Sequence, residues 1–269
     1  MSMIDPVDIK HGDGPIVLGL PHTGTHVPDD IAAKLNDRGR ELADTDWHIH
    51  TLYDGLLDNV TTVRATFHRY VIDANRDPAG VSLYPGENTT TLVPLTDFDG
   101  KNIWDQAPDA DDIAFRADNF HASYHAALAA ELDRVRAKHG VAILYDCHSI
   151  RSHIPFLFDG VLPDFNIGTN MGTTCDPVIE AATRAVCEAA DGYSSILNGR
   201  FKGGWTTRHY GRPEINQHAI QMELAQSAYL SAEAAPWTYD AARSAKLRLH
   251  LTSILEKLAE LAPTLRGTS

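Results

Sequence analysis

The stretch VAILYDCH, residues 141–148, decides the fold of this 269-residue chain. Its first five residues are apolar or aromatic, and a short run of this kind predicts a buried strand over Val141–Asp146. His148 follows that strand, behind an acid and a thiol. Three interpretations of His148 are open at this point: a packed core histidine, a catalytic base beside Cys147, or a metal ligand whose partners lie elsewhere in the chain.

Strands and helices alternate on both sides of this stretch. Apolar and β-branched runs predict strands, and apolar residues at helical spacing predict helices. Besides Val141–Asp146, the expected strands are Pro15–Leu20, Thr61–Thr66, Arg69–Asp73, Ser194–Leu197 and Ala219–Ala225. The expected helices are Asp29–Leu35, Asp46–Leu57, Asp111–Lys138, Asp176–Ala190 and Tyr239–Leu261. This order predicts an α/β fold with a mostly parallel, mixed sheet flanked by helices. Since no stretch resembles a linker or a repeat, we expect residues 1–269 to form a single domain.

The composition restricts the classes of partner. A formal charge of −13 argues against nucleic acid or an anionic membrane, and a small anionic substrate would need a local cluster of arginines. Three cysteines, an odd and sparse count, indicate reduced thiols in a cytoplasmic protein. The first residues lack the apolar core of a signal peptide, and no apolar run approaches the roughly 20 residues of a membrane span. The composition leaves the oligomeric state open.

Two histidines follow predicted strands at equivalent places. His22 comes after Pro15–Leu20, and His148 comes after Val141–Asp146. Ligands of open α/β sheets bind outside the carboxyl ends of the strands, so the two side chains can meet at one edge. Taken alone, each would more often be a hydrogen-bonded core histidine. Together with a carboxylate and a water molecule, however, they would form a catalytic zinc site.

Asp46 is the candidate for the carboxylate ligand. It lies in the first turn of the predicted helix Asp46–Leu57. The alternative is that it caps this helix or interacts with the helix dipole. Cys147 and His148 are adjacent on an extended segment and point opposite ways, so the two form a poor nucleophile pair.

Glu223 projects from a mostly apolar predicted strand. In AIQMELA, residues 219–225, the large apolar side chains face one side, and Gln221 and Glu223 face the other. An unpaired buried carboxylate has a large desolvation cost, so we expect Glu223 to have a partner that offsets it. Beside a metal ion with its water, Glu223 would be a general base. The alternative is an ion pair with one of the arginines.

Arginines cluster in two places. RYVIDANRDP, residues 69–78, holds Arg69, Asn75 and Arg76, and the glycine-rich NGRFKGGWTTRHYGRP, residues 198–213, holds Arg208 together with Arg200, Lys202 and Arg212. Arginine binds carboxylates through two parallel hydrogen bonds, so such a loop in an acidic protein would make an anion clamp. We expect Arg200 and Arg212 to be solvated surface residues.

The stretch Gly80–Asp112 is rich in Pro, Gly, Thr and Asp and has no periodicity. Loops of this length in compact domains are usually functional, so we expect part of it to line or cover the site. His121 and His125 lie four residues apart on the predicted helix Asp111–Lys138. We expect them at the polar edge of its apolar stripe.

Several blocks of the sequence resemble the N-formylglutamate amidohydrolase (deformylase) family. This family belongs to a wider group of zinc carboxypeptidase-like hydrolases, with aspartoacylase and succinylglutamate desuccinylase as relatives. The resemblance covers nearly the whole chain. It rests on PHTG (21–24), DTDWH (44–48), FHRYVIDANRDP (67–78), SLYPGENTTTLVPLTDFDG (82–100), YDCHSIRS (145–152), KGGWTTRHYG (202–211) and AIQMELAQSAYL (219–230).

The resemblance implies hydrolysis of N-formyl-L-glutamate to L-glutamate and formate, the last step of a histidine degradation route. It implies one divalent metal ion, with zinc as the first choice. Thr25 stands where the wider group has a glutamate ligand, which leaves Asp46 as the carboxylate. The roles that it implies are metal ligation for His22, Asp46 and His148, catalysis for Glu223 and Arg69, and substrate binding for Asn75, Arg76 and Arg208. Two alternatives remain: the same chemistry on another N-acyl amino acid, and a non-catalytic protein that binds a small acid.

Overall fold

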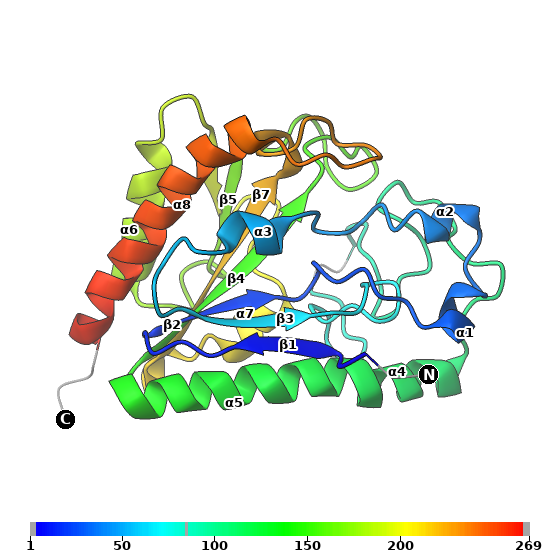
Figure 1. The fold of residues 1–269 in the computed structure, drawn as a ribbon, viewed down its shortest axis with the longest axis horizontal. Helices are drawn as coiled ribbons and strands as arrows, with labels where there is room; N and C mark the ends of the chain where they lie inside the picture. The colour runs from blue at the N-terminus through cyan, green and yellow to red at the C-terminus, as the bar shows by residue number, and fades with distance from the viewer. Residues whose placement is uncertain (1–3, 84–85, 266–269) are drawn as a thin grey trace.

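The computed structural model describes residues 4–83 and 86–265 and builds them around one seven-stranded sheet (Figure 1). The order across the sheet is β1-β3-β2-β4-β7-β5-β6. β3, β2, β4 and β7 run parallel, whereas β1 is antiparallel to β3 and β5 is antiparallel to β7. This confirms the predicted mostly parallel, mixed sheet. The strands are β1 (Val7–Lys10), β2 (Ile16–Leu20), β3 (Thr61–Ala65), β4 (Ala142–Ile150), β5 (Phe165–Gly168), β6 (Ser195–Leu197) and β7 (Gln217–Ala225).

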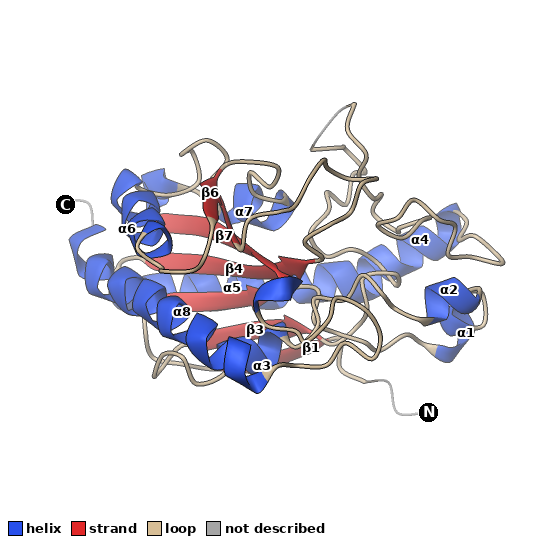
Figure 2. Ribbon diagram, turned by 90° about the horizontal axis from the view of Figure 1, so that it is seen from above, coloured by secondary structure: helices blue, strands red, loops and turns tan. Residues whose placement is uncertain are grey.

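Helices cover both faces of the sheet (Figure 2). α3 (Ile49–Tyr53), α6 (Pro177–Glu188) and α8 (Ala241–Leu261) pack on one face, and α5 (Ala122–His139) and α7 (Trp205–Tyr210) pack on the other. The short helices α1 (Asp29–Ala32) and α2 (Asp37–Arg40) lie with α4 (Ala110–Arg116) beyond one end of the sheet (Figure 1). None of the helices described combines the length and apolar character that a membrane span requires.

The predicted helix Asp111–Lys138 is present in three continuous parts. α4 is followed by a π-helical turn, Ala117–His121, and then by α5. The helix ends at Gly140, whose φ of 74° lies in the left-handed region that favours glycine. The predicted apolar stripe is buried against the sheet at Tyr124, Leu128, Leu132 and Val135.

The two central strands, β4 and β7, change from apolar to polar along one face. On the face toward α8, the side chains of both strands are apolar as far as Cys147 in β4 and Leu224 in β7. Toward α5, the apolar side chains give way to polar ones as the carboxyl ends of the strands approach. The two strands are paired in register, which sets Asp146 beside Gln221 and His148 beside Glu223. The strand alternation expected for Glu223 is therefore confirmed.

Some predicted elements differ from those observed. β4 continues to Ile150 because it pairs with β7 along its whole length, so His148 lies within the strand and does not follow it. The predicted helix Asp46–Leu57 shrinks to α3, because His48 has a φ of 59° and a left-handed residue cannot belong to an α-helix. Asp46 therefore precedes the helix, outside its first turn. Arg69–Asp73 forms turns and irregular backbone instead of a strand, and β1, β5, α2 and α7 were not predicted.

Candidate functional site

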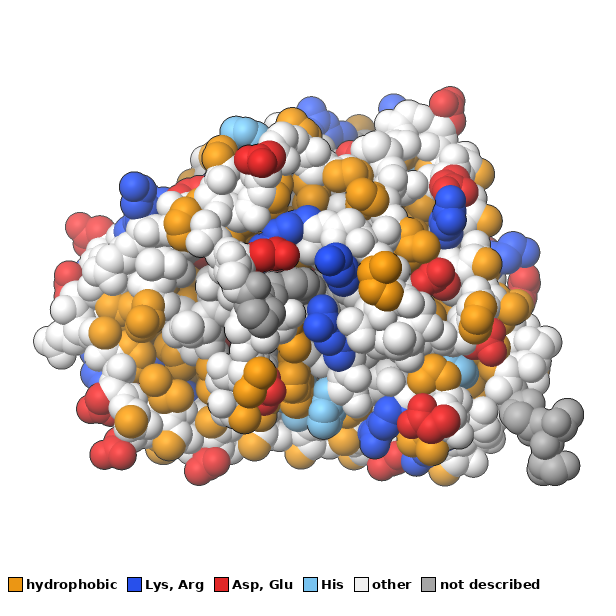
Figure 3. All heavy atoms as spheres, turned by 180° about the vertical axis from the view of Figure 1, so that it is seen from behind, with side chains coloured by type: hydrophobic (Ala, Val, Ile, Leu, Met, Phe, Trp, Pro, Cys, Tyr) orange, Lys and Arg blue, Asp and Glu red, His pale blue; other side chains and the backbone are white. Residues whose placement is uncertain are grey.

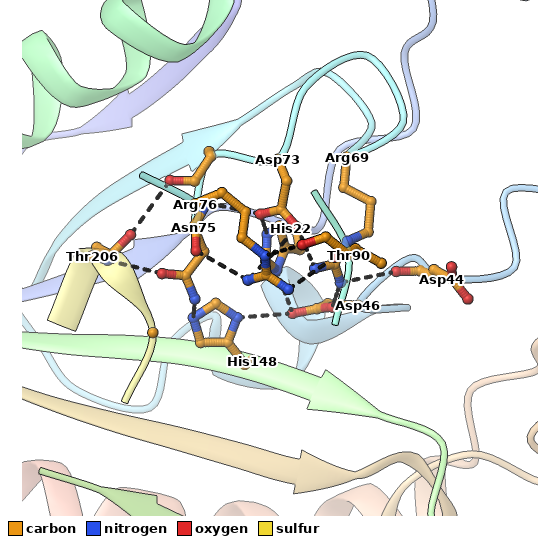
Figure 4. A network of polar contacts seen from close by, with 12 residues as sticks. His22, Asp44, Asp46, Arg69, Asp73, Asn75, Arg76, Thr90, His148 and Thr206 are labelled. Atoms are coloured by element: carbon orange, nitrogen blue, oxygen red, sulfur yellow. Dashed lines mark hydrogen bonds and ion pairs between the residues drawn. The ribbon is translucent and has the colours of Figure 1, made fainter. Parts of the chain in front are cut away.

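His22, Asp46 and His148 converge at the carboxyl ends of β2 and β4 (Figure 4). The Nδ1 atoms of both histidines face Asp46 Oδ2, at 3.7 Å for His22 and 3.4 Å for His148. One ligand atom from each of the three residues lies within 4.8 Å of the other two, and all three side chains are buried. The predicted set of metal ligands is thus brought together in space.

The polar atoms of this cluster fit a bound cation. The two distances to Asp46 Oδ2 are longer than those of good hydrogen bonds, although Ser149 N donates to the same oxygen at 3.1 Å. Asp46 Oδ1 is buried and has no hydrogen-bond partner among the described residues. Two imidazole nitrogens and a carboxylate are a donor set typical of zinc and related ions. The cluster can therefore hold a metal ion, and helix capping does not explain Asp46.

Each histidine also contacts a second carboxylate through its other ring nitrogen. His22 Nε2 lies 2.7 Å from Asp73 Oδ1, and His148 Nε2 lies 3.1 Å from Asp146 Oδ1. Histidines that bind metals are usually oriented in this way by an outer carboxylate. Neither aspartate was among the predicted site residues, although Asp146 precedes His148 by two residues on the same strand face. Asp73 and Asp146 therefore lie directly outside the three proposed ligands, each in contact with one of the histidines.

Asp46 and His148 hold opposite charges when no metal is bound. Burial disfavours a charged His148, but the carboxylates of Asp146 and Asp46 raise its pKa well above the usual value. Burial also disfavours a charged Asp46, yet His148 and His22 hold its pKa below the usual range. A metal ion that binds here must therefore displace a proton from His148.

Arg69 and Asp73 form a buried ion pair beside the cluster. Arg69 Nη2 donates to Asp73 Oδ2 at 2.7 Å, and the guanidinium lies 4.8 Å from the centre of the Phe98 ring. Burial lowers the pKa of Arg69, but Asp73 and Asp46 more than offset this effect, so the side chain stays charged. Arg69 Nε is buried and has no hydrogen-bond partner in the part of the chain that the structure describes.

Glu223 lies on the neighbouring strand, with only 7% of its surface exposed. Its Oε2 accepts a hydrogen bond from Gln221 Nε2 at 3.1 Å. Among the residues described, no ion pair joins Glu223 to an arginine, so the alternative of an arginine salt bridge is not observed. Burial raises the pKa of Glu223 to about 8. A carboxyl group with such a pKa suits proton transfer at neutral pH.

One pocket connects the cluster with Glu223 and with part of the long loop. Four of its lining residues, Asn88, Thr89, Thr90 and Phe98, come from the stretch Gly80–Asp112. The expectation that part of this stretch lines the site is therefore confirmed; Tyr84 and Pro85 lie outside the described residues. The rest of the lining is His22, Arg69, Asn75, Arg76, His148, Ser149, Ile150, Leu157, Arg200, Phe201, Gly204, Gln221 and Glu223.

Asn75 connects the cluster to the start of α7. Its Oδ1 accepts a hydrogen bond from Thr206 N at 2.9 Å, and its Nδ2 lies 3.3 Å from His148 Nε2 (Figure 4). A Cβ atom at Gly204 would lie 2.2 Å from Asn75 Nδ2, so only glycine permits this close approach. The next residue, Arg76, donates through Nε to Thr90 O and through Nη2 to Thr90 Oγ1, at 3.0 and 2.9 Å.

The arginines of the glycine-rich loop lie in three different settings. Arg200 lines the pocket and its side chain is only 17% exposed, so the expectation of a surface position was wrong. It donates to Leu157 O and Asn88 O, both at 3.0 Å, and these two carbonyls draw it inward. Arg208 is missing from the described residues that line the pocket; it lies on α7, where its Nε donates to Gly203 O. Arg212 is exposed, as expected.

The surface charge is unevenly distributed. The chain carries a formal charge of −13, yet Lys and Arg side chains gather near the centre of the face opposite to that of Figure 1 (Figure 3). The three cysteines are free and buried, and none forms a disulfide.

Comparisons with known proteins show similarity over nearly the whole chain. The N-formylglutamate deformylase of Pseudomonas aeruginosa is 45% identical over 259 residues, which covers 95% of this chain and 97% of the relative. The enzyme of that name from Pseudomonas putida is 44% identical over 255 residues, or 94% and 95% of the two chains.

Solved structures show the same fold. The crystal structure of N-formylglutamate amidohydrolase from Ralstonia eutropha JMP134 has a TM-score of 0.80 at 25% identity, covering 97% of this chain and 99% of the other. A gene product from Agrobacterium tumefaciens shares the fold at 16% identity, with a TM-score of 0.72 over 95% of each chain. Residues 14–230 match the family described as N-formylglutamate amidohydrolase. This match and the identity to the two curated relatives place the chain in the N-formylglutamate amidohydrolase family.

Proposed function

We propose that this protein hydrolyses N-formyl-L-glutamate to L-glutamate and formate, with a divalent metal ion held by His22, Asp46 and His148. One observation carries the proposal: the two histidines of a buried His–Asp–His cluster line one pocket together with Glu223 and the arginines Arg69, Arg76 and Arg200. The names of the two Pseudomonas relatives support the choice of substrate. Zinc is the proposed metal, because two imidazoles and one carboxylate suit it.

Glu223 is the proposed general base and acid. A divalent ion in the cluster would lower the pKa of a water molecule toward roughly 7 and polarise the formyl oxygen. Glu223 accepts the proton of the water that attacks the formyl carbon. As the C–N bond breaks, Glu223 delivers that proton to the leaving amine nitrogen. Burial raises the pKa of Glu223 to about 8 in the metal-free protein, and a bound cation nearby would lower this pKa toward the neutral range, in which one carboxyl group can serve in both steps.

Arg69 is proposed to stabilise the negative charge that develops on the formyl oxygen. It lines the pocket, keeps its charge and has a buried Nε–H without a partner among the described residues. Donors that are already oriented toward a developing charge stabilise the transition state strongly in a buried site. Its ion pair with Asp73 holds the guanidinium in place for this purpose.

Two arginines are proposed to hold the two carboxylates of the substrate. Arg76, next to Asn75, would bind the carboxylate nearer to the cluster. For the second carboxylate we propose Arg200, because it lines the pocket. Arg208, which the resemblance suggested, lies on α7 beside the glycine turn and is the alternative that mutation can distinguish. The proposed setting is a cytoplasmic histidine degradation route, and the free cysteines accord with a reducing compartment.

The test is a formate-release assay combined with metal analysis of the purified protein. We expect release of formate from N-formyl-L-glutamate, slower turnover of N-acetyl- and N-succinyl-L-glutamate, and about one divalent ion per chain. Comparable rates on all three substrates would point instead to a broader amidohydrolase of N-acyl amino acids. Tight binding of the substrate without turnover and without metal would indicate a binding protein.

A further inference from the structure

His121 and His125 form a buried pair that the proposed reaction does not use. They were expected at the polar edge of a stripe, yet they are only 3% and 8% exposed. The centroids of their rings lie 4.4 Å apart. Both rings contact the ring of Trp205 at the start of α7, with 5.5 Å between centroids for His121 and 4.7 Å for His125. The expectation was wrong because the turn around Asn75 and the helix α7 cover this part of the long helix.

Each imidazole donates a hydrogen bond to the turn that carries Asn75 and Arg76. His121 Nε2 lies 3.0 Å from Arg76 O, and His125 Nε2 lies 2.7 Å from Ala74 O. A carbonyl oxygen can only accept, so both rings carry a proton on Nε2. Burial lowers the pKa of both side chains, that of His125 to about 3, so both are neutral donors at neutral pH. The two carbonyls flank Asn75 on either side.

The position of His121 in the helix is unusual. It is the last residue of the π-helical turn Ala117–His121, in which Ala122 N bonds to Ala117 O. Such turns inside α-helices occur frequently at functional sites. The wider turn changes the phase of the helix, so the side chains from His121 onward are rotated relative to those of α4.

We propose that His121 is a positioning residue for substrate binding. Its Nε2–H holds the carbonyl group of Arg76 and thereby fixes the direction in which the Arg76 side chain enters the pocket. This inference rests on the proposed function, in which Arg76 holds a carboxylate of the substrate. Arg76 lines the pocket and His121 is not among the described residues that do, so His121 acts through Arg76.

His125 supports the same turn from the other side of Asn75. Besides its bond to Ala74 O, its Nδ1 lies 3.1 Å from the hydroxyl oxygen of Tyr210 on α7. His125 therefore connects α5, the turn and α7, and its loss would disturb all three. His121 makes fewer connections, which makes it the better residue for a test.

A matched pair of variants, His121→Gln and His121→Asn, tests the proposal. Both introduce a side-chain amide, but only glutamine places its NH2 group near the position of Nε2, within reach of Arg76 O. We expect His121→Asn to raise KM for N-formyl-L-glutamate about tenfold, with kcat within about threefold of wild type, as for the loss of one hydrogen bond that acts on binding. His121→Gln should keep KM within about threefold of wild type.

His209→Asn is the control. His209 is exposed and stacks on Trp205 with 4.3 Å between ring centroids, so it belongs to the same aromatic group without holding the turn. Its KM should not change. Metal content and Tm are measured for every variant. If His121→Asn does not fold, His121→Met, which fills the space without a donor, replaces it.

Equal KM values for His121→Gln and His121→Asn would overturn the proposal, and so would a fall in kcat at unchanged KM. The wild-type enzyme is assayed in parallel. A wild type that releases no formate would contradict the proposed function itself, whereas a normal wild-type rate with an unchanged KM in His121→Asn would contradict only the positioning role.

Discussion

Replacement of Glu223 by glutamine tests the proposed base. Glu223→Gln keeps the volume of the side chain and removes its capacity to accept a proton. Gly204 N donates to Gln221 Oε1 at 2.6 Å, so the NH2 group of Gln221 faces residue 223 and requires an oxygen there. The new NH2 group at position 223 then points away from Gln221 and presents a donor where the reaction needs an acceptor. Since such proton transfer contributes roughly 100- to 10,000-fold, kcat for formate release should fall by about that factor.

The same substitution changes how the stability of the metal-free protein depends on pH. Burial raises the pKa of Glu223 from 4.5 to about 8. In the unfolded chain this carboxyl group ionises above about pH 4.5, whereas in the folded chain it keeps its proton to about pH 8. The free energy of unfolding therefore decreases as the pH rises through this window, by up to about 1.4 kcal/mol per pH unit. Glu223→Gln removes this contribution, so the metal-free variant should be more stable than metal-free wild type at pH 8, and the difference should shrink toward pH 4.

Three measurements decide the outcome: formate release, metal content, and urea unfolding in the presence of a chelator at several pH values. KM and metal content should stay near those of wild type, because Glu223 is not one of the three proposed ligands. Normal turnover in Glu223→Gln would refute the reasoning. Loss of metal from this variant, while Asp46→Asn keeps its metal, would show that Glu223 is a ligand.

The remaining predictions concern the metal and the substrate. His148→Ala should lose its metal and its activity together, and full metal occupancy in this variant would contradict the assignment of the ligands. Asp73→Asn should weaken metal binding about 10- to 100-fold, because the outer carboxylate that orients His22 is lost; an unchanged affinity in a metal titration would show that Asp73 acts only through its ion pair. Arg200→Gln should raise KM for N-formyl-L-glutamate about tenfold or more, since it removes a charged hydrogen bond to a carboxylate, whereas Arg208→Gln should change KM little. If Arg208→Gln raised KM more than Arg200→Gln did, Arg208 would be the residue that holds the substrate carboxylate.

The strand pattern predicted the centre of the fold and the direction of Glu223. Alternation in β7 depends only on neighbouring residues, so it is visible in the sequence, and the structure places the apolar side chains in the core and Glu223 in the pocket. The convergence of His22 and His148 followed from a general property of parallel sheets, whose carboxyl ends meet at one edge.

Other features depend on contacts between segments far apart in the chain. The end of β4 is set by its pairing with β7, so the sequence predicted a strand that was four residues too short at that end. Arg200 and Arg208 look alike in a glycine-rich loop; what separates them is the carbonyl groups of Leu157 and Asn88 and the carboxylate of Glu87, which all hold Arg200. The helical pattern at Asp46 failed because His48 takes a left-handed conformation, which no local pattern indicated.

The register between β4 and β7 makes the site sensitive to insertions and deletions. Successive side chains of a strand alternate between the two faces, so a shift of β4 by a single residue would turn His148 into the core beneath α8 and bring Cys147 to the pocket. A one-residue deletion early in β4 would thus remove a ligand without changing any residue of the site. In a library of single deletions, activity should therefore be lost along the whole length of these two strands, even far from the chemistry, while loops that do not line the pocket tolerate the same change.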